Sequence, residues 1–112
     1  MTRARFDELI HAPTRLSLVS LLAATDWAEF RYLREQLDLS DSALSKQLSA
    51  LERAGYAEIR KSFVGKRART SVTLTRRGRD AFAGHVAALQ EIVARAGATV
   101  TPAAAPPSGS GC

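Results

Sequence analysis

The side chains with the most evident chemistry in this chain are basic, and they are concentrated in one segment. The segment from Ile59 to Arg79 carries eight Lys and Arg side chains and no acid. The whole chain has 16 Lys and Arg against 11 Asp and Glu, so eight basic residues face eleven acidic ones outside that segment. Charge polarised in this way attracts a polyanion to one place. Nucleic acid is therefore the first partner to consider.

Polar side chains that can hydrogen-bond to DNA bases lie just before the basic segment. Leu44, Leu48 and Leu51 repeat at helical spacing and predict a helix with one buried face. Hydroxyl, amide and ammonium groups on the remaining surface suit base edges or phosphates, although a solvated polar face is the ordinary alternative. The predicted base-contacting residues are Ser42, Ser45, Lys46, Gln47 and Ser49.

Three helices are expected to position that polar face. The first begins at Pro13, which suits a first helical turn, and the second begins after Asp26 and repeats apolar residues up to Leu37. The third takes Ser40 as its N-cap and ends before Gly55, which tolerates the left-handed conformation. Two short helices joined by a few residues form a helix-turn-helix.

After the third helix the pattern changes to a period of two, which predicts a β-hairpin. One strand is expected from Ala57 to Phe63 and another around Val72 and Leu74. The loop VGKRART lies between them, and Gly65 suits its tight turn. We expect this hairpin to be a wing whose cations bind DNA phosphates or a narrow minor groove. The predicted wing contacts are Lys61, Lys66, Arg67 and Arg69.

A long helix is expected to follow, with Thr75 as its N-cap and Gly78 allowing a close backbone approach. Its apolar residues repeat every 3.5 residues on average, the spacing of helices that pack lengthwise on one another. We therefore expect it to pair with a second copy, together with the short leading helix; a helix that covers only its own domain is the alternative. His85 is expected to be a packing or interface residue. The predicted interface residues are Phe6, Leu9, Ile10, Phe82, Val86, Leu89 and Val93.

The remaining features limit the class of protein. Residues 1–98 are expected to form one domain, and the Pro/Ala/Gly/Ser-rich residues 99–112 a disordered tail that ends in the single Cys112. No apolar stretch reaches the roughly 18 residues of a membrane span, and no secretory signal is recognisable, so a cytoplasmic protein is expected. The chain has no phosphate-binding glycine loop, nucleophile motif or set of metal ligands, so no catalytic site, cofactor or metal is predicted.

Four segments then carry a resemblance to a known family: RLSLVSLL, LSDSALSKQLSALERAGY, KSFVGKRART and LTRRGRDAF, which follow one another between Phe6 and Val93. In this order they resemble the winged helix-turn-helix transcription regulators of bacteria and archaea, in particular short MarR-like members with some ArsR-like character. The resemblance implies a mainly α fold with a small β-hairpin wing (α+β), and terminal helices that form a dimer interface. It implies a homodimer that binds a palindromic double-stranded DNA operator, with the third core helix in the major groove, and represses transcription.

Two departures from the family pattern limit what the resemblance implies. Only His11, His85 and Cys112 are available for a metal site of the ArsR type, so metal sensing is not expected. The chain is also shorter than MarR-type proteins that enclose a pocket for an aromatic ligand, so no effector is assigned. A winged-helix module that binds an acidic protein partner is the alternative. Neither the operator nor the choice between repression and activation follows from the sequence.

Overall fold

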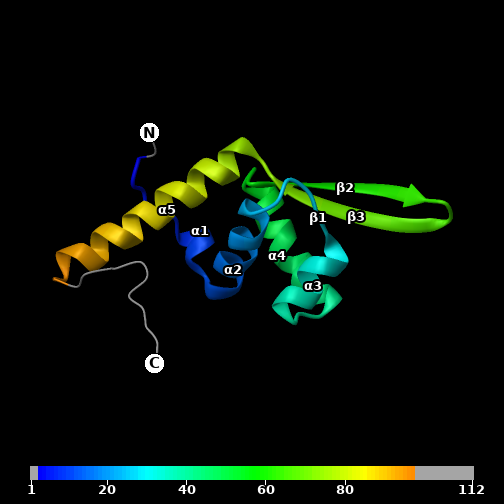
Figure 1. Cartoon of the computed structure of the whole chain (residues 1–112), viewed down its shortest axis with the longest axis horizontal. Coiled ribbons are helices and arrows are strands. Elements are labelled where there is room, and N and C mark those ends of the chain that lie inside the picture. Colours follow the sequence, from blue (N-terminus) through cyan, green and yellow to red (C-terminus); the bar gives the residue numbers. More distant parts are fainter. Residues whose placement is uncertain (1–2, 98–112) are drawn as a thin grey trace, which may run out of the picture.

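The computed structural model describes residues 3–97, which form five helices and one three-stranded antiparallel sheet. Figure 1 shows the hairpin of the last two strands extending from one side of the helical body and the last helix extending from the other. This arrangement confirms the predicted mainly α fold with a hairpin wing. The elements are α1 (Glu8–His11), α2 (Pro13–Ala23), β1 (Ala28–Glu29), α3 (Phe30–Leu37), α4 (Asp41–Arg53), β2 (Ala57–Val64), β3 (Arg67–Leu74) and α5 (Arg76–Arg95).

The core lies where α1, α2, α3 and α4 meet the base of the sheet, and it is made almost entirely of aliphatic side chains. The leucine stripe that predicted α4 is buried, as are Leu18, Val19 and Leu22 of α2. Each such side chain contributes about 1.5–3 kcal/mol when it is removed from water. The fully buried residues include Ile10, Leu18, Leu22, Leu33, Leu44, Leu51 and Val72.

The predicted capping residues are found at the start of α4, at the start of α5 and at the end of α4. The Ser40 hydroxyl accepts a hydrogen bond from the Ala43 N–H at 3.1 Å, and the Thr75 hydroxyl accepts one from the Gly78 N–H at 3.0 Å. Each cap contributes about 1 kcal/mol. Gly55 follows α4 with a φ of 79°, as the left-handed end of a helix requires.

The predicted start of the second core helix is wrong. α3 begins at Phe30, and the two residues before it form β1, in which Ala28 pairs with Val72 and Glu29 with Ser71. A strand of two residues is too short to show a period, and it exists only because the edge of β3 is available to pair with it. Asp26 is therefore not the N-cap of this helix.

The predicted wing loop is also too long. β2 and β3 pair without interruption from Ala57 opposite Leu74 to Val64 opposite Arg67, so the turn consists of Gly65 and Lys66 alone. Arg67 and Arg69 lie in a strand and not in the loop. The sequence pattern missed this half of β3 because both faces of it are polar or exposed, so hydrophobic alternation is absent there.

Two glycines of α5 bring the last helix against the rest of the body. A Cβ on Gly78 would fall well inside contact distance of the Tyr56 carbonyl group, which confirms the predicted close approach. At Gly84 the carbonyl group accepts a hydrogen bond from the Arg5 N–H at 2.9 Å. The N-terminal segment therefore lies directly on α5. Within residues 3–97 no helix is long and apolar enough to cross a membrane.

Candidate nucleic-acid interface

The surface of α4 that faces away from the core is polar and accessible. Ser42, Ser45 and Lys46 are exposed and Ser49 is half-buried, while the leucines of the same helix are buried. The start of α4 is held by an ion pair of 2.8 Å between Arg34 of α3 and Asp41, and this hydrogen bond raises the pKa of Arg34. The helix-turn-helix is thus fixed at its turn.

Gln47 differs from the other predicted base-contacting residues because the protein itself binds its side chain. The Gln47 carbonyl oxygen accepts a hydrogen bond from Arg15 Nη1 of α2 at 3.0 Å. The Nε of the same arginine donates to the Leu9 carbonyl oxygen at 2.6 Å. Arg15 thus links α4 to the end of α1, and Gln47 has an internal role that its sequence spacing did not reveal.

An open groove of about 590 Å³ separates α4 from the wing. Its α4 wall contains Ser45 and Ser49, and its wing wall contains Lys61 and Thr70. Asp41 and Glu52 of α4 also line it. The structure therefore brings one predicted wing cation beside two predicted base-contacting serines, on one continuous concave surface.

The wing has two faces that differ in charge, because successive side chains of a strand point to opposite sides of a sheet. Ile59 and Lys61 line the groove, so Phe63 and its neighbour Ala68 belong to the same side, here called the groove face. Glu58, Arg60 and Arg69 belong to the other side, the outer face.

On the outer face two arginines, Arg60 and Arg69, already have partners, whereas Arg67, which pairs with Val64 on the same face, is in none of the ion pairs among the described residues. Arg60 lies 3.6 Å from Glu58 and stacks on the Trp27 ring at 4.2 Å from its centroid. Arg69 lies 3.8 Å from Glu29 of β1. By contrast, none of the ion pairs within the described residues involves Lys61.

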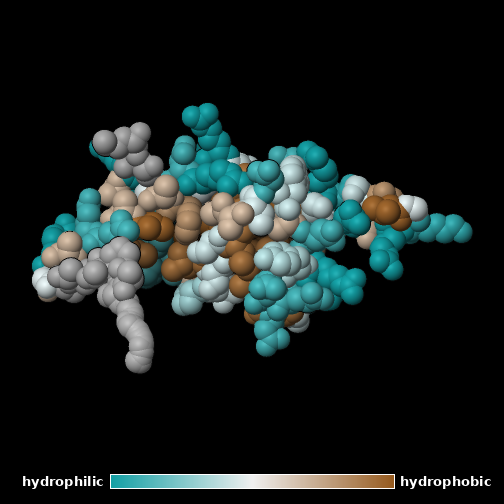
Figure 2. Space-filling view, in the orientation of Figure 1, coloured by the Kyte–Doolittle hydropathy of each residue, from teal (hydrophilic) through white to brown (hydrophobic). Residues whose placement is uncertain are grey.

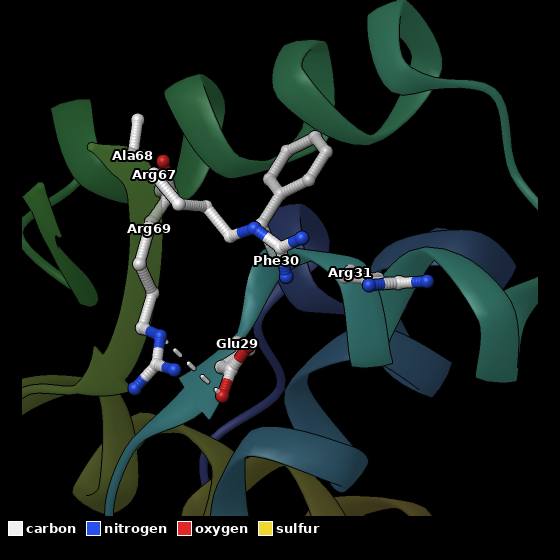
Figure 3. A pocket seen from close by; sticks show the side chains of 7 residues that line it. Glu29, Phe30, Arg31, Arg67, Ala68 and Arg69 are labelled. Atoms are coloured by element: carbon white, nitrogen blue, oxygen red, sulfur yellow. Dashed lines mark ion pairs between the residues drawn. The ribbon is translucent and has the colours of Figure 1, made fainter. Parts of the chain in front are cut away.

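A smaller hollow of about 250 Å³ lies where β3 meets the start of α3 (Figure 3). In Figure 3, Arg69 turns to Glu29, whereas Arg67 reaches from β3 toward Phe30. The side chain of Glu29, the N-cap residue of α3, makes no cap hydrogen bond, so the first N–H groups of the helix remain unsatisfied by it. Arg67 and this helix end suit a phosphate group better than a base edge.

Two of the arginines at the start of α5, Arg77 and Arg79, are not part of this surface. Arg79 donates to the Ala23 and Thr25 carbonyl oxygens at 3.3 and 3.0 Å, so it holds α5 to the end of α2. Arg77 lies over the Tyr56 ring and beside Gly55, at the C-terminal end of α4. A helix of 13 residues is about 20 Å long, so Arg77 lies far from the end of α4 that a helix-turn-helix presents to DNA.

The predicted dimer residues fall into two groups. On α5, Phe82, Val86, Leu89 and Val93 are half-buried, and Figure 2 shows apolar side chains gathered where α5 passes α1. Ile92, which is not among the predicted interface residues, is 45% exposed on the same helix. At the N-terminus, Phe6 is 40% exposed and Leu9 is half-buried, but Ile10 is fully buried in the core of its own subunit. Its side chain is therefore not available to a partner.

His85 is a packing residue beneath the N-terminal segment. It is fully buried, its Nδ1 accepts a hydrogen bond from the Asp7 N–H at 3.0 Å, and its Nε2 lies 3.3 Å from Nδ1 of His11. The Phe6 ring packs against both imidazoles. Burial and the neighbouring His11 lower the pKa of His85 below its usual value.

These elements, a helix-turn-helix followed by a two-stranded wing, define a class of DNA-binding domain. The family model of the winged helix DNA-binding domain matches residues 14–93. The chain belongs to this family, and solved structures with a similar fold include transcriptional regulators.

The chain is also similar to particular proteins in sequence or in fold. The chain is 33% identical over 79 residues to an uncharacterized protein of Methanocaldococcus jannaschii, a match that covers 70% of this chain and 86% of that one. Its fold is similar to a transcriptional regulator homologue from Pyrococcus horikoshii OT3, with a TM-score of 0.75 and 24% identity over 80% of this chain and 89% of that chain. It is also similar to the PcaV transcriptional regulator from Streptomyces coelicolor, solved with its natural ligand, with a TM-score of 0.64 and 20% identity over 80% and 65% of the two chains.

Proposed function

We propose that this protein is a homodimeric, sequence-specific DNA-binding regulator that represses transcription from a palindromic operator. The observation that carries the proposal is the groove between α4 and the wing, where Ser45, Ser49 and Lys61 share one surface. In this proposal the N-terminal part of α4 lies in the major groove, whose width admits one helix. Its exposed residues, above all Ser42, Ser45 and Lys46, contact base edges or the adjacent phosphates.

The wing contributes mainly to affinity. Lys61 from the groove face and Lys66 from the turn bind phosphates of the flanking backbone, and Arg67 binds a phosphate at the hollow beside α3. Contacts of this kind carry no sequence information but fix the register of the protein on the duplex. Arg69 makes a weaker contribution, because its ion pair with Glu29 must first be given up.

The dimer in this proposal forms along α5. The apolar residues of α5 that its own subunit leaves half-buried or exposed form a stripe with the spacing of lengthwise helix packing. Phe6 adds an exposed ring beside this helix. A two-fold axis at α5 presents two copies of α4 to successive turns of the major groove, which requires half-sites about 34–36 Å apart.

The experiment that tests DNA recognition begins with selection of binding sites from random duplexes, followed by fluorescence anisotropy with the selected duplex. We expect a palindrome with half-sites about 10–10.5 base pairs apart. If about eight phosphates are neutralised, log K falls against log salt with a slope of about −7. A slope shallower than about −2, or no enriched sequence, would contradict the proposal, and binding to an acidic protein instead would favour the interaction module.

The dimer is tested by sedimentation of the full chain at micromolar concentration. Ile92→Glu places a charge in the apolar stripe of α5 and is expected to give a monomer with at least tenfold weaker operator binding, on the order of the penalty for one buried charge. Gln90→Glu is the matched control, since it adds the same charge at an exposed position of the same helix. Repression is tested by transcription in vitro from a promoter that contains the operator, where an increase in transcript would indicate an activator.

A further inference from the structure

The tip of the wing exposes a large apolar side chain, Phe63. Phe63 is 72% exposed and Val64 is 53% exposed. Phe63 pairs across the hairpin with Ala68, whose methyl group covers little of an aromatic ring. In Figure 2 these side chains form a small apolar patch at the far end of the wing, bordered by hydrophilic residues.

The ring belongs to the groove face of the wing. Along β2, Ile59 packs against the core, Lys61 lines the groove beside α4, and Phe63 is the next residue on the same side. Four residues of strand span about 13 Å, so Phe63 lies about that far beyond the edge of the core. A ligand that contacts both α4 and Lys61 therefore has Phe63 beside it.

The hairpin presents this ring in a defined position. The turn has two residues, with Gly65 at a φ of 65° in the first of them and no left-handed residue in the second, which is the pattern of a type II′ turn. All eight residues of β2 are paired with β3. The backbone that carries the ring is therefore a regular two-stranded ribbon, and little backbone entropy is lost when a partner contacts it.

The charge around the tip identifies the chemistry of that partner. From Ile59 to Thr70 the wing carries five cations and no acid. A second copy of the wing would bring like charges together, which disfavours pairing of two tips. A polyanion with flat apolar surfaces between its charges fits both features, because cations bind the backbone while an aromatic ring contacts a base.

We propose that Phe63 is a wedge that enters the minor groove of DNA beside the site bound by α4 and partly unstacks one base step. This inference rests on the proposed DNA-binding function and adds to it a deformation of the duplex. Pyrimidine–purine steps such as TA are the most easily unstacked. The operator is therefore read at this step through its flexibility, and the wedge bends the duplex toward the major groove.

The test uses the full-length protein and the selected duplex, labelled with a fluorophore at each end and with 2-aminopurine at the step that the wing reaches. With wild-type protein we expect the end-to-end distance to shorten and the 2-aminopurine emission to rise. Phe63→Ala is expected to abolish both signals and to weaken binding by about tenfold, the range found for loss of one base–aromatic contact. Phe63→Leu, which remains an apolar wedge, is expected to retain most of the bend.

Val64→Ala is the matched control, because it removes a neighbouring exposed apolar side chain from the other face of the same strand. Phe63 is mostly exposed, so its replacement leaves the fold intact, which thermal unfolding of each variant verifies. If Phe63→Ala binds DNA with unchanged bend and emission, the wedge is overturned while the regulatory function stands. If wild-type protein selects no DNA, both are overturned. Capture of an acidic peptide through Phe63, with no change in DNA, also overturns the wedge.

Discussion

The two faces of the wing differ in their cations: the outer face carries Arg60, Arg67 and Arg69, and the groove face carries Lys61. On the outer face, Arg60 and Arg69 have acidic partners, and Arg60 also stacks on Trp27. On the groove face, Lys61 stands beside an open groove with Ser45 and Ser49 on its opposite wall. The comparison shows that a basic segment of sequence locates a binding surface only approximately. In the folded protein, some of its cations pair with acidic or aromatic side chains of the protein itself.

The same division appears along the whole basic segment. Arg79 binds two backbone carbonyl groups, and Arg77 covers Tyr56. These arginines join α5 to the end of α2 and to the residue that precedes β2. The cations of the basic segment are therefore divided between contacts within the protein and the groove-face Lys61, to which we assign a proposed phosphate contact.

The largest effect is expected when the packing between α5 and the residue before β2 is disturbed, because this contact positions both faces of the wing relative to the helical body. Gly78→Ala places a Cβ against the Tyr56 carbonyl group at the start of β2, and it is expected to cost about 3 kcal/mol of unfolding free energy. The measurement is urea unfolding followed by circular dichroism. Gly65→Ala is the control: its Cβ meets nothing within 4 Å, so only the left-handed backbone, about 1 kcal/mol, is expected to matter. Equal costs would refute tight packing at Gly78.

The comparison is tested most directly by two neighbouring substitutions on opposite faces of β2. Lys61→Ala is expected to weaken operator binding by about tenfold and to make the salt slope shallower by about 0.9, the effect of one lost phosphate contact. Arg60→Ala is expected to change affinity by less than about twofold, since its ion pair is exposed and internal. Anisotropy titrations at several salt concentrations measure both. The same slope change in the two variants would abolish the distinction between the faces.

Two residues of α4 differ in a similar way: Gln47 is hydrogen-bonded within the protein, whereas Ser45 is exposed. Gln47→Ala is expected to lower the unfolding free energy by about 1 kcal/mol, because Arg15 loses its hydrogen-bond acceptor, with little change in sequence preference. Ser45→Ala is expected to leave stability unchanged and to reduce discrimination against altered operators by about fivefold. Competition binding with single-base variants of the operator separates these outcomes; a larger loss of discrimination in Gln47→Ala would reverse the assignment.

The smallest effect is a dependence of stability on pH. It is expected to arise in the helical body and not in either face of the wing. The pKa of His85 is lowered in the folded protein, mainly by burial and also by His11, whereas Asp7 opposes the shift. The unfolded chain, with a His pKa of about 6.5, therefore takes up a proton first, and stability decreases as the pH falls below about 6.5 toward the folded value. Urea midpoints at a series of pH values measure this decrease.

His85→Gln is expected to flatten that pH dependence, since glutamine does not titrate. The wing contains no histidine, so the salt slope of DNA binding is expected to be the same above and below this pH range. A slope that changes with pH in wild-type protein but not in His85→Gln would show that the body and the wing are coupled.

The sequence predicted the parts of the fold that depend on local patterns. Leu44, Leu48 and Leu51 define the buried side of α4, and Ser40 and Thr75 cap the helices that their positions indicate. These signals are read from neighbouring residues. They were sufficient for the order of the helices and for the hairpin.

The features that the sequence did not predict depend on contacts between distant residues. β1 forms because Ala28 meets Val72, and Gln47 is bound by an arginine 32 positions earlier. Arg67 and Arg69 lie in a part of β3 that lacks apolar alternation. This part forms a strand because it pairs with β2. The exposure of Phe63 was also missed, because alternation alone cannot tell whether an apolar residue reaches the core or passes beyond it.

Among the described strands, β2 is at the edge of the sheet, since the order is β1-β3-β2. An edge strand of eight residues offers backbone N–H and C=O groups to any other extended chain, and this one ends in the exposed Phe63 and Val64. Arg60 and Lys61 place charge in the middle of that edge, and like charges oppose the pairing of two copies. We therefore expect Arg60 and Lys61 to oppose aggregation through this edge, and a variant that neutralises both to precipitate at lower protein concentration than either single variant.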